Sequence, residues 1–397
     1  MRSGSETDPA TGIGADGPPQ AVLAAVALIS ASALAFEVLL IRVFSIAQWH
    51  HFAHMVISLA LLGYGASGTA LVFLRRWLLA RFAISFPVLA AAFGMAVPLS
   101  VWATGLLPLN MPELPWDRAQ PVYLVAVYVV LAVPFFFVGM AIGLAISRAG
   151  EGVGRVYRSD LVGAGAGAAA VVAVLFAAPV GVCIKAIALV AFTAAALTVW
   201  RGGVRRTVPF VTLTLASVIV VGLPDAVVKP QPSPYKGLAR ALTVPDAEIV
   251  AERSSPLALL TVVRSPTVPW RHAPGLSLNA DAEPPDQLAV FTDGGAMTAI
   301  TRFDGGLDPL RYLDGQGAAL PYHLLHRPRV LVLGAGGGGD VLLARYHRAR
   351  SVDAVEVNPQ QDTLKNLRFD SGSRPPMAEP GKWAFGGNAP QRGINTR

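Results

Sequence analysis

Residues 329–359, RVLVLGAGGGGDVLLARYHRARSVDAVEVNP, form the stretch that decides how the C-terminal part of this chain folds. Residues 330–333 are a short apolar run with β-branched side chains, as expected of a buried parallel strand. A glycine run at 334–339 follows at once, and residues 341–346 then show the apolar spacing of a helix. A second apolar strand is predicted at 352–357. The order strand, glycine turn, helix, strand predicts a parallel α/β unit.

Gly334, Gly336 and Gly339 satisfy the spacing G-x-G-x-x-G in this strand-to-helix context. Without side chains, the backbone can turn tightly and approach a ligand, whose polar groups then meet the amides at the helix start. Glu356 ends the second strand, where a carboxylate can accept hydrogen bonds from ribose hydroxyls. These features predict a site for a nucleoside-containing cofactor and do not say which one. The alternative, a flexible loop beside a solvated acid, leaves the agreement of all four elements unexplained.

The composition is that of a membrane protein. The chain has 397 residues, of which 53% are hydrophobic and 14% charged, whereas soluble proteins carry about 25% charged residues. Seven apolar runs approach the ~20 residues that a bilayer core demands. They predict spans at about 21–46, 52–74, 82–108, 121–147, 160–179, 181–200 and 207–224, preceded by a disordered tail at 1–20. The seventh run is the shortest and contains Pro209 and Pro224.

Arginines gather at 75–81, 148–158 and 201–206, which are alternate loops, so the positive-inside rule places the N-terminus inside. The net charge of +7 therefore does not require a nucleic-acid partner. With seven spans, the part after residue 224 would lie outside. A nucleoside cofactor favours the cytoplasmic side of a cell inner membrane, so either 207–224 is not a span or the C-terminal part is extracytoplasmic.

Four ionisable residues fall at membrane depth: Glu37, Arg42, Asp160 and Lys185. Such groups are costly in lipid and are expected to be paired or functional, with Glu37 and Arg42 as a candidate pair unless Arg42 snorkels. The small residues of Gly163-x-x-x-Gly167 and of 63–67 predict close helix packing.

No metal site is expected from the sequence. His50 and His54 are one helical turn apart, but neither a cysteine nor a third carboxylate ligand stands nearby. The single cysteine, Cys183, excludes a disulfide framework within one chain.

The composition of residues 225–328 is richer in Pro, Lys and Asp, which predicts a linker followed by a small β domain. Short strands are expected at 249–253, 257–264, 288–293 and 296–301, with a hairpin turn at Asp293-Gly294-Gly295. A helix over 318–326 would place Tyr322 and His323 just before the strand at 330–333 that precedes the glycine run. Residues 329–369 then form a partial Rossmann-like unit, with a helix at 360–367. The Gly- and Pro-rich stretch 370–397 predicts a disordered or aberrant tail, as if the chain stopped inside its cofactor fold.

Several stretches resemble the membrane-fused branch of the polyamine aminopropyltransferase (spermidine synthase) family. They are FEVLLIRVFSIAQWHHFAHMVISLALLGYGASG, YRSDLVGAGAGA, SPYKGLARAL, LAVFTDG, LPYHLL, VLVLGAGGGGDVLLA and VDAVEVNP, and the likeness covers nearly all of residues 21–361. The resemblance implies a multi-span membrane domain, a small β domain and a Rossmann-like domain that binds S-adenosylmethionine or its decarboxylated form. It also implies site residues. Gly334, Gly336, Gly338 and Asp340 would line the nucleoside pocket with Gly339, Glu356 would bind the ribose, and Asp293, Tyr322 and His323 would belong to the substrate pocket.

Three departures from the family pattern concern catalysis. The soluble enzymes carry an acid at the position of Gly337 and another at the position of Leu324, and their later acidic motif has no counterpart here. Transfer to an amine needs a neutral nucleophile and hence a nearby base. No catalytic residue is assigned, and we expect this chain, as given, to be inert and its segment after residue 329 to be loosely held or docked onto the β domain.

Three functions fit the sequence. The favoured one is a membrane-bound transferase that uses an S-adenosyl donor for aminopropyl or methyl transfer to a polyamine or other small amine, with the lipid bilayer and a second copy of the chain as partners. The second is an integral membrane transport or scaffold protein with a degenerate cofactor domain, which the intramembrane charges support. The third is an NAD(P)-linked oxidoreductase, which the glycine motif also permits. The predicted β domain and the LPYHLL stretch before the glycine strand disfavour this function.

Overall fold

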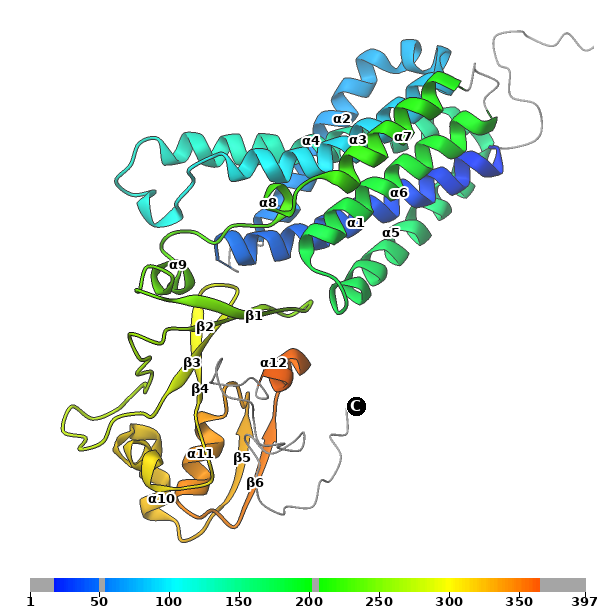
Figure 1. Cartoon of the computed structure of the whole chain (residues 1–397). Coiled ribbons are helices and arrows are strands. Elements are labelled where there is room, and N and C mark those ends of the chain that lie inside the picture. The colour runs from blue at the N-terminus through cyan, green and yellow to red at the C-terminus, as the bar shows by residue number, and fades with distance from the viewer. Residues whose placement is uncertain (1–17, 50–53, 202–206, 365–397) are drawn as a thin grey trace, which may run out of the picture. The chain divides into compact units, whose positions relative to one another are not determined.

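The structure, a computed structural model, describes residues 18–49, 54–201 and 207–364 (Figure 1). The chain forms two compact units that divide between Gln231 and Pro232. Predictions about the N-terminal tail, His50, the 201–206 loop and the segment after 364 lie wholly or partly outside the described residues. The side chain of His54 is likewise not described.

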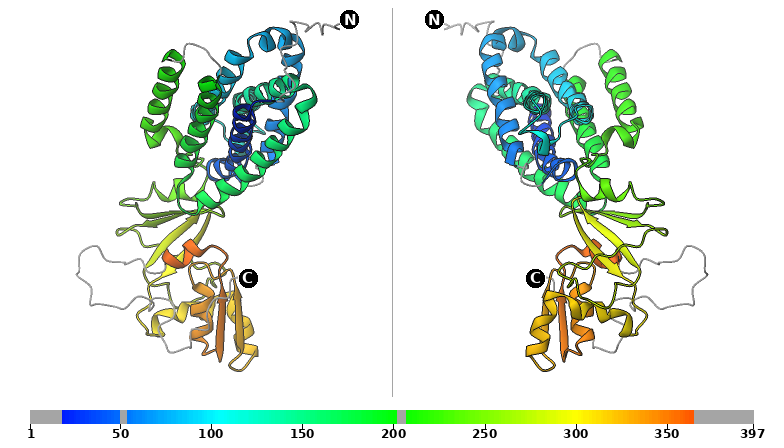
Figure 2. Two further views of the ribbon diagram at one scale, coloured as in Figure 1. Left: turned by 90° about the vertical axis from the view of Figure 1, so that its right-hand side faces the viewer. Right: turned by 90° about the vertical axis from the view of Figure 1, so that its left-hand side faces the viewer.

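The first unit is a bundle of long apolar helices that lie side by side (Figures 1 and 2). Six described helices are long and apolar enough to cross a membrane, which fits a multi-pass membrane protein. They are α1 (Gln20–Ala47), α2 (His54–Ala80), α3 (Phe82–Gly105), α4 (Gln120–Arg148), α5 (Val153–Leu175) and α6 (Val180–Arg201). Each corresponds to one predicted span. Short helical turns lie at Met111–Glu113 (η2) and Gly150–Gly152 (η3).

The seventh predicted span forms a shorter helix, α7 (Thr207–Gly222), of 16 residues. At 1.5 Å per residue such a helix is about 24 Å long, less than the ~30 Å of a bilayer core. The described residues thus contain six helices long enough to cross a bilayer core, and the seventh predicted span is a shorter apolar helix that packs along α6. A further short helix, α8 (Asp225–Val228), follows it.

Small residues set the close packing within the bundle, as the sequence predicted. A Cβ at Gly163 would come within 2.7 Å of the backbone of Ala27, and one at Gly167 within 2.5 Å of that of Ala31. Helices α1 and α5 therefore run in the same direction with their backbones in contact. Gly63 likewise approaches the backbone of α4.

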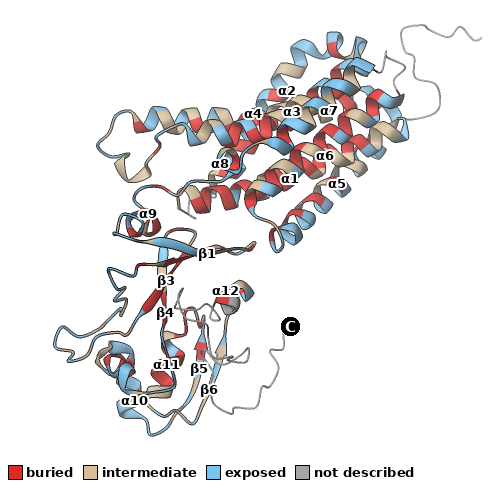
Figure 3. Cartoon of the chain, in the orientation of Figure 1, coloured by how far each residue is buried: buried red, intermediate tan, exposed pale blue. Residues whose placement is uncertain are grey.

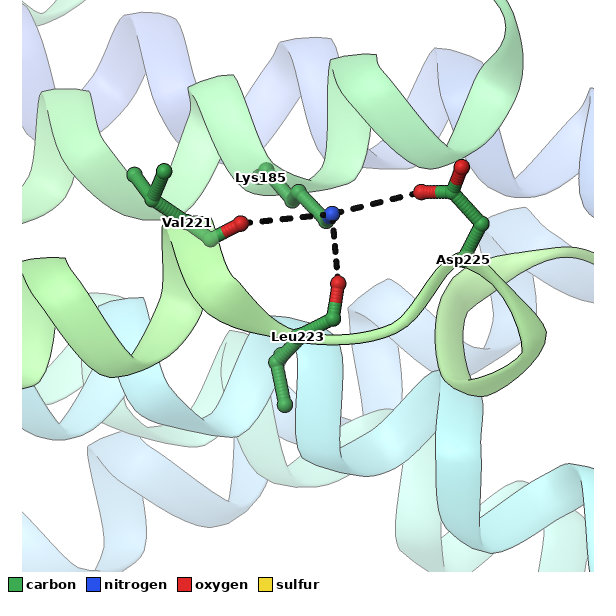
Figure 4. A network of polar contacts seen from close by, with 4 residues as sticks. All are labelled: Lys185, Val221, Leu223 and Asp225. Atoms are coloured by element: carbon green, nitrogen blue, oxygen red, sulfur yellow. Dashed lines mark hydrogen bonds and ion pairs between the residues drawn. The ribbon is translucent and has the colours of Figure 1, made fainter.

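Contacts among the helix ends show which elements meet at each end of the bundle. At one end, the guanidinium of Arg148 lies 4.5 Å from the centre of the Phe82 ring, and Gly152 lies against Pro18. The arginines that close α2 and α4 thus share one end with the start of α1. At the other end, Lys185 near the start of α6 binds the end of α7 (Figure 4). The chain leaves the bundle at this second end.

The second unit holds two small sheets. Strands β1 (Glu248–Ser254), β2 (Leu259–Arg264), β3 (Gln287–Thr292) and β4 (Ala296–Thr301) form an antiparallel sheet in sequence order. One face buries Leu260, Val262 and Val290, and the other buries Val263 and Phe291 against the short helix α9 (Gly237–Ala241). All four strands match the predicted ones to within two residues at each end.

A parallel pair, β5 (Arg329–Leu333) and β6 (Ser351–Val355), is joined by helix α11 (Gly339–Tyr346). Val332, Ala335 and Val341 form the core of this strand–helix–strand unit, whereas Leu333 and Val357 are exposed. Figure 3 colours the described residues by their burial. The predicted helix over 318–326 is shorter: the turns η4 (Asp308–Gly315) and η5 (Gly317–Ala319) lead into α10 (Leu320–Leu324). Helix α12 (Pro359–Leu364) is the last described element. Two parallel strands do not make a complete doubly wound sheet.

Candidate functional site

The glycine turn between β5 and α11 contains backbone conformations that are unfavourable for residues with a side chain. Gly334, Gly336 and Gly338 have φ angles of 77°, 51° and 90°, in the left-handed region that glycine adopts without a steric penalty. Gly338 is the residue that precedes the first turn of α11. The amides of Gly334 and Ala335 both donate to the carbonyl of Val355, which ties the turn to the end of β6.

Glu356 lies directly over this turn. Its Oε2 accepts a hydrogen bond from the amide of Gly336 at 2.9 Å, and its Oε1 accepts one from the amide of Asn358, also at 2.9 Å. Each carboxylate oxygen has a second lone pair, so the group can still accept hydrogen bonds from a diol. These bonds also turn the chain away from its pairing with β5, which explains why β6 ends at Val355, two residues before the predicted end.

Gly337 is where the turn meets the antiparallel sheet. A Cβ at this position would come within 2.6 Å of the carbonyl carbon of Ala299 and closer still to its oxygen. The amide of Gly337 also lies 3.4 Å from the Thr298 hydroxyl on β4. The position that carries an acid in the resembling family has no room for a side chain here unless β4 moves. Of the segment after residue 329, the described glycine turn is thus docked onto the β sheet, one of the two outcomes expected.

Asp293 stabilises the hairpin turn between β3 and β4. With Gly294 it forms the turn between β3 and β4, both residues at positive φ, as the predicted hairpin requires. Its Oδ1 accepts from the amide of Leu259 at 2.8 Å, and its carbonyl accepts from Lys236 Nζ. Thr298 lies opposite Val290, three residues before Asp293, so about 10 Å of strand separates Asp293 from the part of β4 that meets the glycine turn.

Tyr322 and His323 on α10 belong to a polar cluster beside α11. The ring of Tyr322 stacks on that of His347 at 4.9 Å, and Asp314 Oδ1 lies 2.9 Å from His323 Nε2 and 3.2 Å from His347 Nε2. Burial raises the pKa of the Tyr322 phenol, and the charge of Asp340 raises it further. Tyr322 is therefore within electrostatic reach of Asp340, which lies in the first turn of α11.

Asp314 and His347 were not predicted from the sequence. They come from η4 and from the residue after α11, so no spacing in the chain relates them to His323. Their ligand atoms and that of His323 lie within 4.8 Å of one another, and two imidazoles with a carboxylate are a donor set that divalent transition metals accept. Burial lowers the pKa of His347, the Asp314 carboxylate opposes this effect, and His323 adds to it.

The ionisable residues of the bundle separate into two groups. Lys185 Nζ donates to the carbonyl of Leu223 at 2.6 Å and pairs with Asp225 at 3.3 Å (Figure 4). It caps the last carbonyls of α7, which is a structural role. Glu37 and Asp160 instead line a common cavity of about 440 Å³. In the described part of the chain, no ion pair joins Glu37 to Arg42, so the candidate pair does not form.

Comparison of the chain with protein-family models, with curated proteins and with solved structures finds no match in any of the three. The functional argument therefore depends on the geometry of the chain itself.

Proposed function

We propose that this chain is a membrane-anchored, spermidine-synthase-like protein whose C-terminal unit binds an S-adenosyl nucleoside, S-adenosylmethionine or its decarboxylated form, as donor for transfer to a small amine. One observation carries the proposal: a turn with three left-handed glycines precedes α11, and Glu356, the residue after β6, accepts a hydrogen bond from the amide of Gly336. Parallel strands on either side of the turn bring both parts to the same edge of the sheet.

The arrangement suits a nucleoside in two ways. Glu356 keeps free lone pairs toward a diol while its backbone bonds fix its orientation. The turn presents backbone without side chains, so a planar, polar ligand can approach it closely. Among the residues expected in the substrate pocket, Tyr322 lies within electrostatic reach of Asp340 beside this turn, and an amine acceptor would meet carboxylate and phenol groups there.

The test is calorimetry on the full chain in detergent with S-adenosylmethionine, its decarboxylated form and NAD. Glu356→Gln should weaken the S-adenosyl ligand by about tenfold to a hundredfold, the effect of losing a hydrogen bond of about 1.5–3 kcal/mol to a charged group. The matched control is Glu283→Gln, which removes an exposed acid of the same unit that pairs with Arg271.

Equal affinity of Glu356→Gln and the parent chain for the S-adenosyl ligand would refute the assignment. Tighter binding of NAD than of either S-adenosyl compound would replace it with a dinucleotide site. Hydrogen exchange of the 330–345 segment, measured in both variants, separates a lost ligand contact from a displaced turn.

A further inference from the structure

Three segments of the second unit bring two histidines and an aspartate to one point. Asp314 lies in η4, His323 lies in α10, and His347 directly follows α11. Asp314 Oδ1 is 2.9 Å from His323 Nε2 and 3.2 Å from His347 Nε2, and the three ligand atoms lie within 4.8 Å of one another. The cluster therefore joins segments that no local interaction along the chain connects.

The Nε2 atom of His347 is buried and has no hydrogen-bond partner among the described residues. Asp314 Oδ1 is close enough at 3.2 Å, but the contact does not have the direction of a hydrogen bond. A buried polar atom without a partner is unfavourable. The His347 nitrogen therefore points to a ligand that the described side chains do not supply.

The separations within the cluster are those of ligands around one ion. Zn²⁺ holds nitrogen and oxygen ligands at about 2.0–2.2 Å, so neighbouring ligand atoms stand about 2.9–3.5 Å apart at octahedral or tetrahedral angles. Both carboxylate–imidazole distances, 2.9 and 3.2 Å, lie in this range. The two imidazole nitrogens need to approach each other by about 1.5 Å or less. A direct ion pair has similar distances, but it would not leave the His347 nitrogen without a partner.

Aromatic contacts fix the ring of His347. Tyr322 stacks on it at 4.9 Å with 13° between the ring planes, and Tyr346 meets it edge-on at 5.2 Å. The side chain of His347 is 13% exposed, whereas those of His323 and Asp314 are 53% and 41% exposed. The cluster thus combines one buried and oriented ligand with two ligands at the surface, through which an ion can enter.

We propose that Asp314, His323 and His347 bind one divalent transition-metal ion of the Zn²⁺ type through Oδ1 and the two Nε2 atoms. Two imidazoles and one carboxylate suit such ions, whereas Mg²⁺ and Ca²⁺ prefer oxygen ligands. Three protein ligands leave a coordination position for water on the exposed side.

The bound ion clamps η4 and α10 to the end of α11. Leu313 of η4 already packs with Leu342 and Leu343 of α11 in one apolar core, and the metal site lies at the rim of these same elements. The strand–helix–strand unit has only two paired strands, so the clamp adds stability where the sheet supplies little. Metal binding to the folded state alone stabilises it by mass action.

The experiment is hydrogen exchange with mass spectrometry on the full chain in detergent, first freed of metal with a chelator. Free Zn²⁺ at ten times its dissociation constant should slow exchange about tenfold in peptides covering 308–324 and 339–347. Mg²⁺ at the same concentration should not. Reading these peptides separates the proposed site from the histidines at 50, 51 and 54.

Variants at the two exposed ligands test the assignment without disturbing the buried ring. Asp314→Asn and His323→Gln should each weaken Zn²⁺ binding by about a hundredfold or more, since loss of an outer partner of a metal ligand alone costs about 10–100-fold. His326→Gln, at an exposed histidine just after α10, is the matched control and should leave the protection unchanged.

A second measurement uses Co²⁺, whose visible absorption reports its coordination. The absorption that appears on adding Co²⁺ to the parent chain should persist in His326→Gln and decrease in His323→Gln. Three results overturn the proposal: no Zn²⁺-dependent protection of the two segments, equal protection by Mg²⁺, or equal Zn²⁺ protection in His323→Gln and His326→Gln. None of these readouts involves an S-adenosyl ligand, so the metal site and the nucleoside site can fail independently.

Discussion

Replacing Gly337 with alanine tests whether the glycine turn is docked onto β4. The new Cβ would stand 2.6 Å from the carbonyl carbon of Ala299 and 3.2 Å from the amide nitrogen of Ile300. Both neighbours are backbone of β4, the edge strand that is paired with β3, so neither can rotate away as a side chain would. The turn must move, which also disturbs the bond between Gly336 and Glu356. Overpacking of about 1–3 kcal/mol and one hydrogen bond of about 1 kcal/mol predict a local loss of about 2–4 kcal/mol.

Two neighbouring glycines supply the controls. A Cβ at Gly339 would meet nothing within 4 Å, and the φ of this residue is ordinary, so Gly339→Ala should be neutral or stabilise α11 by up to about 1 kcal/mol. Gly338 also has open space but a φ of 90°, so Gly338→Ala isolates backbone strain, about 1–2 kcal/mol. The predicted order of local stability is Gly339→Ala, then the parent chain, then Gly338→Ala, then Gly337→Ala.

Hydrogen exchange with mass spectrometry on the full chain is the suitable assay, because it reports each segment separately in a protein of two units. Exchange in peptides covering 296–301 and 330–345 should accelerate about 30-fold or more in Gly337→Ala, the equivalent of about 2 kcal/mol or more. Protection in Gly337→Ala equal to that in Gly339→Ala would show that the turn does not contact β4, and the geometry argued for the nucleoside site would fail with it.

Three further outcomes are expected. Gly167→Ala should destabilise the bundle by about 1–3 kcal/mol by pushing α5 from α1, whereas Gly165→Ala, which has open space, should not; thermal unfolding in detergent distinguishes them. In a cysteine-free background, Ser147→Cys and Gly203→Cys should react with an impermeant maleimide only from the cytoplasmic side, and external labelling would contradict the arginine argument. Burial lowers the pKa of His272, so its contribution to stability is complete above the ordinary histidine pKa and is lost as pH falls through the folded value. Stability of the second unit should therefore decline from about pH 7 to 5, less steeply in His272→Gln.

Local patterns in the sequence predicted most elements because each depended on neighbours in the chain. The hairpin at Asp293-Gly294 follows from residues that tolerate positive φ, and six spans follow from apolar length alone. The contact between Gly337 and Ala299 could not be predicted, since it joins the turn to a strand 38 residues earlier. The Asp314–His323–His347 cluster was missed for the same reason.

The intramembrane charges show where helical geometry could have corrected the sequence argument. Glu37 and Arg42 are five residues apart, which places them about 140° apart around the helix, on different faces. Ser30 and Glu37 are seven apart and lie about 20° from one another, on the same face. Asp160, which accepts a hydrogen bond from Ser30, lies 130 residues away from it in the chain, and only the packing of α5 against α1 reveals this contact.

The course of α7 bears on which side of the membrane the second unit occupies. Lys185, near the start of α6, binds the carbonyl that follows α7, so α7 returns the chain to the end of the bundle opposite Arg148 and Phe82. If the arginine end is cytoplasmic, residues from 232 onward emerge outside, whereas a cytosolic S-adenosyl donor requires them inside. The two requirements oppose each other, and labelling of Leu278→Cys, at a fully exposed position of the second unit, decides between them. Labelling by an external impermeant maleimide would refute transfer from a cytosolic S-adenosyl donor. Labelling from the cytoplasmic side alone, which the proposed function predicts, would require the arginine end of the bundle to face outward.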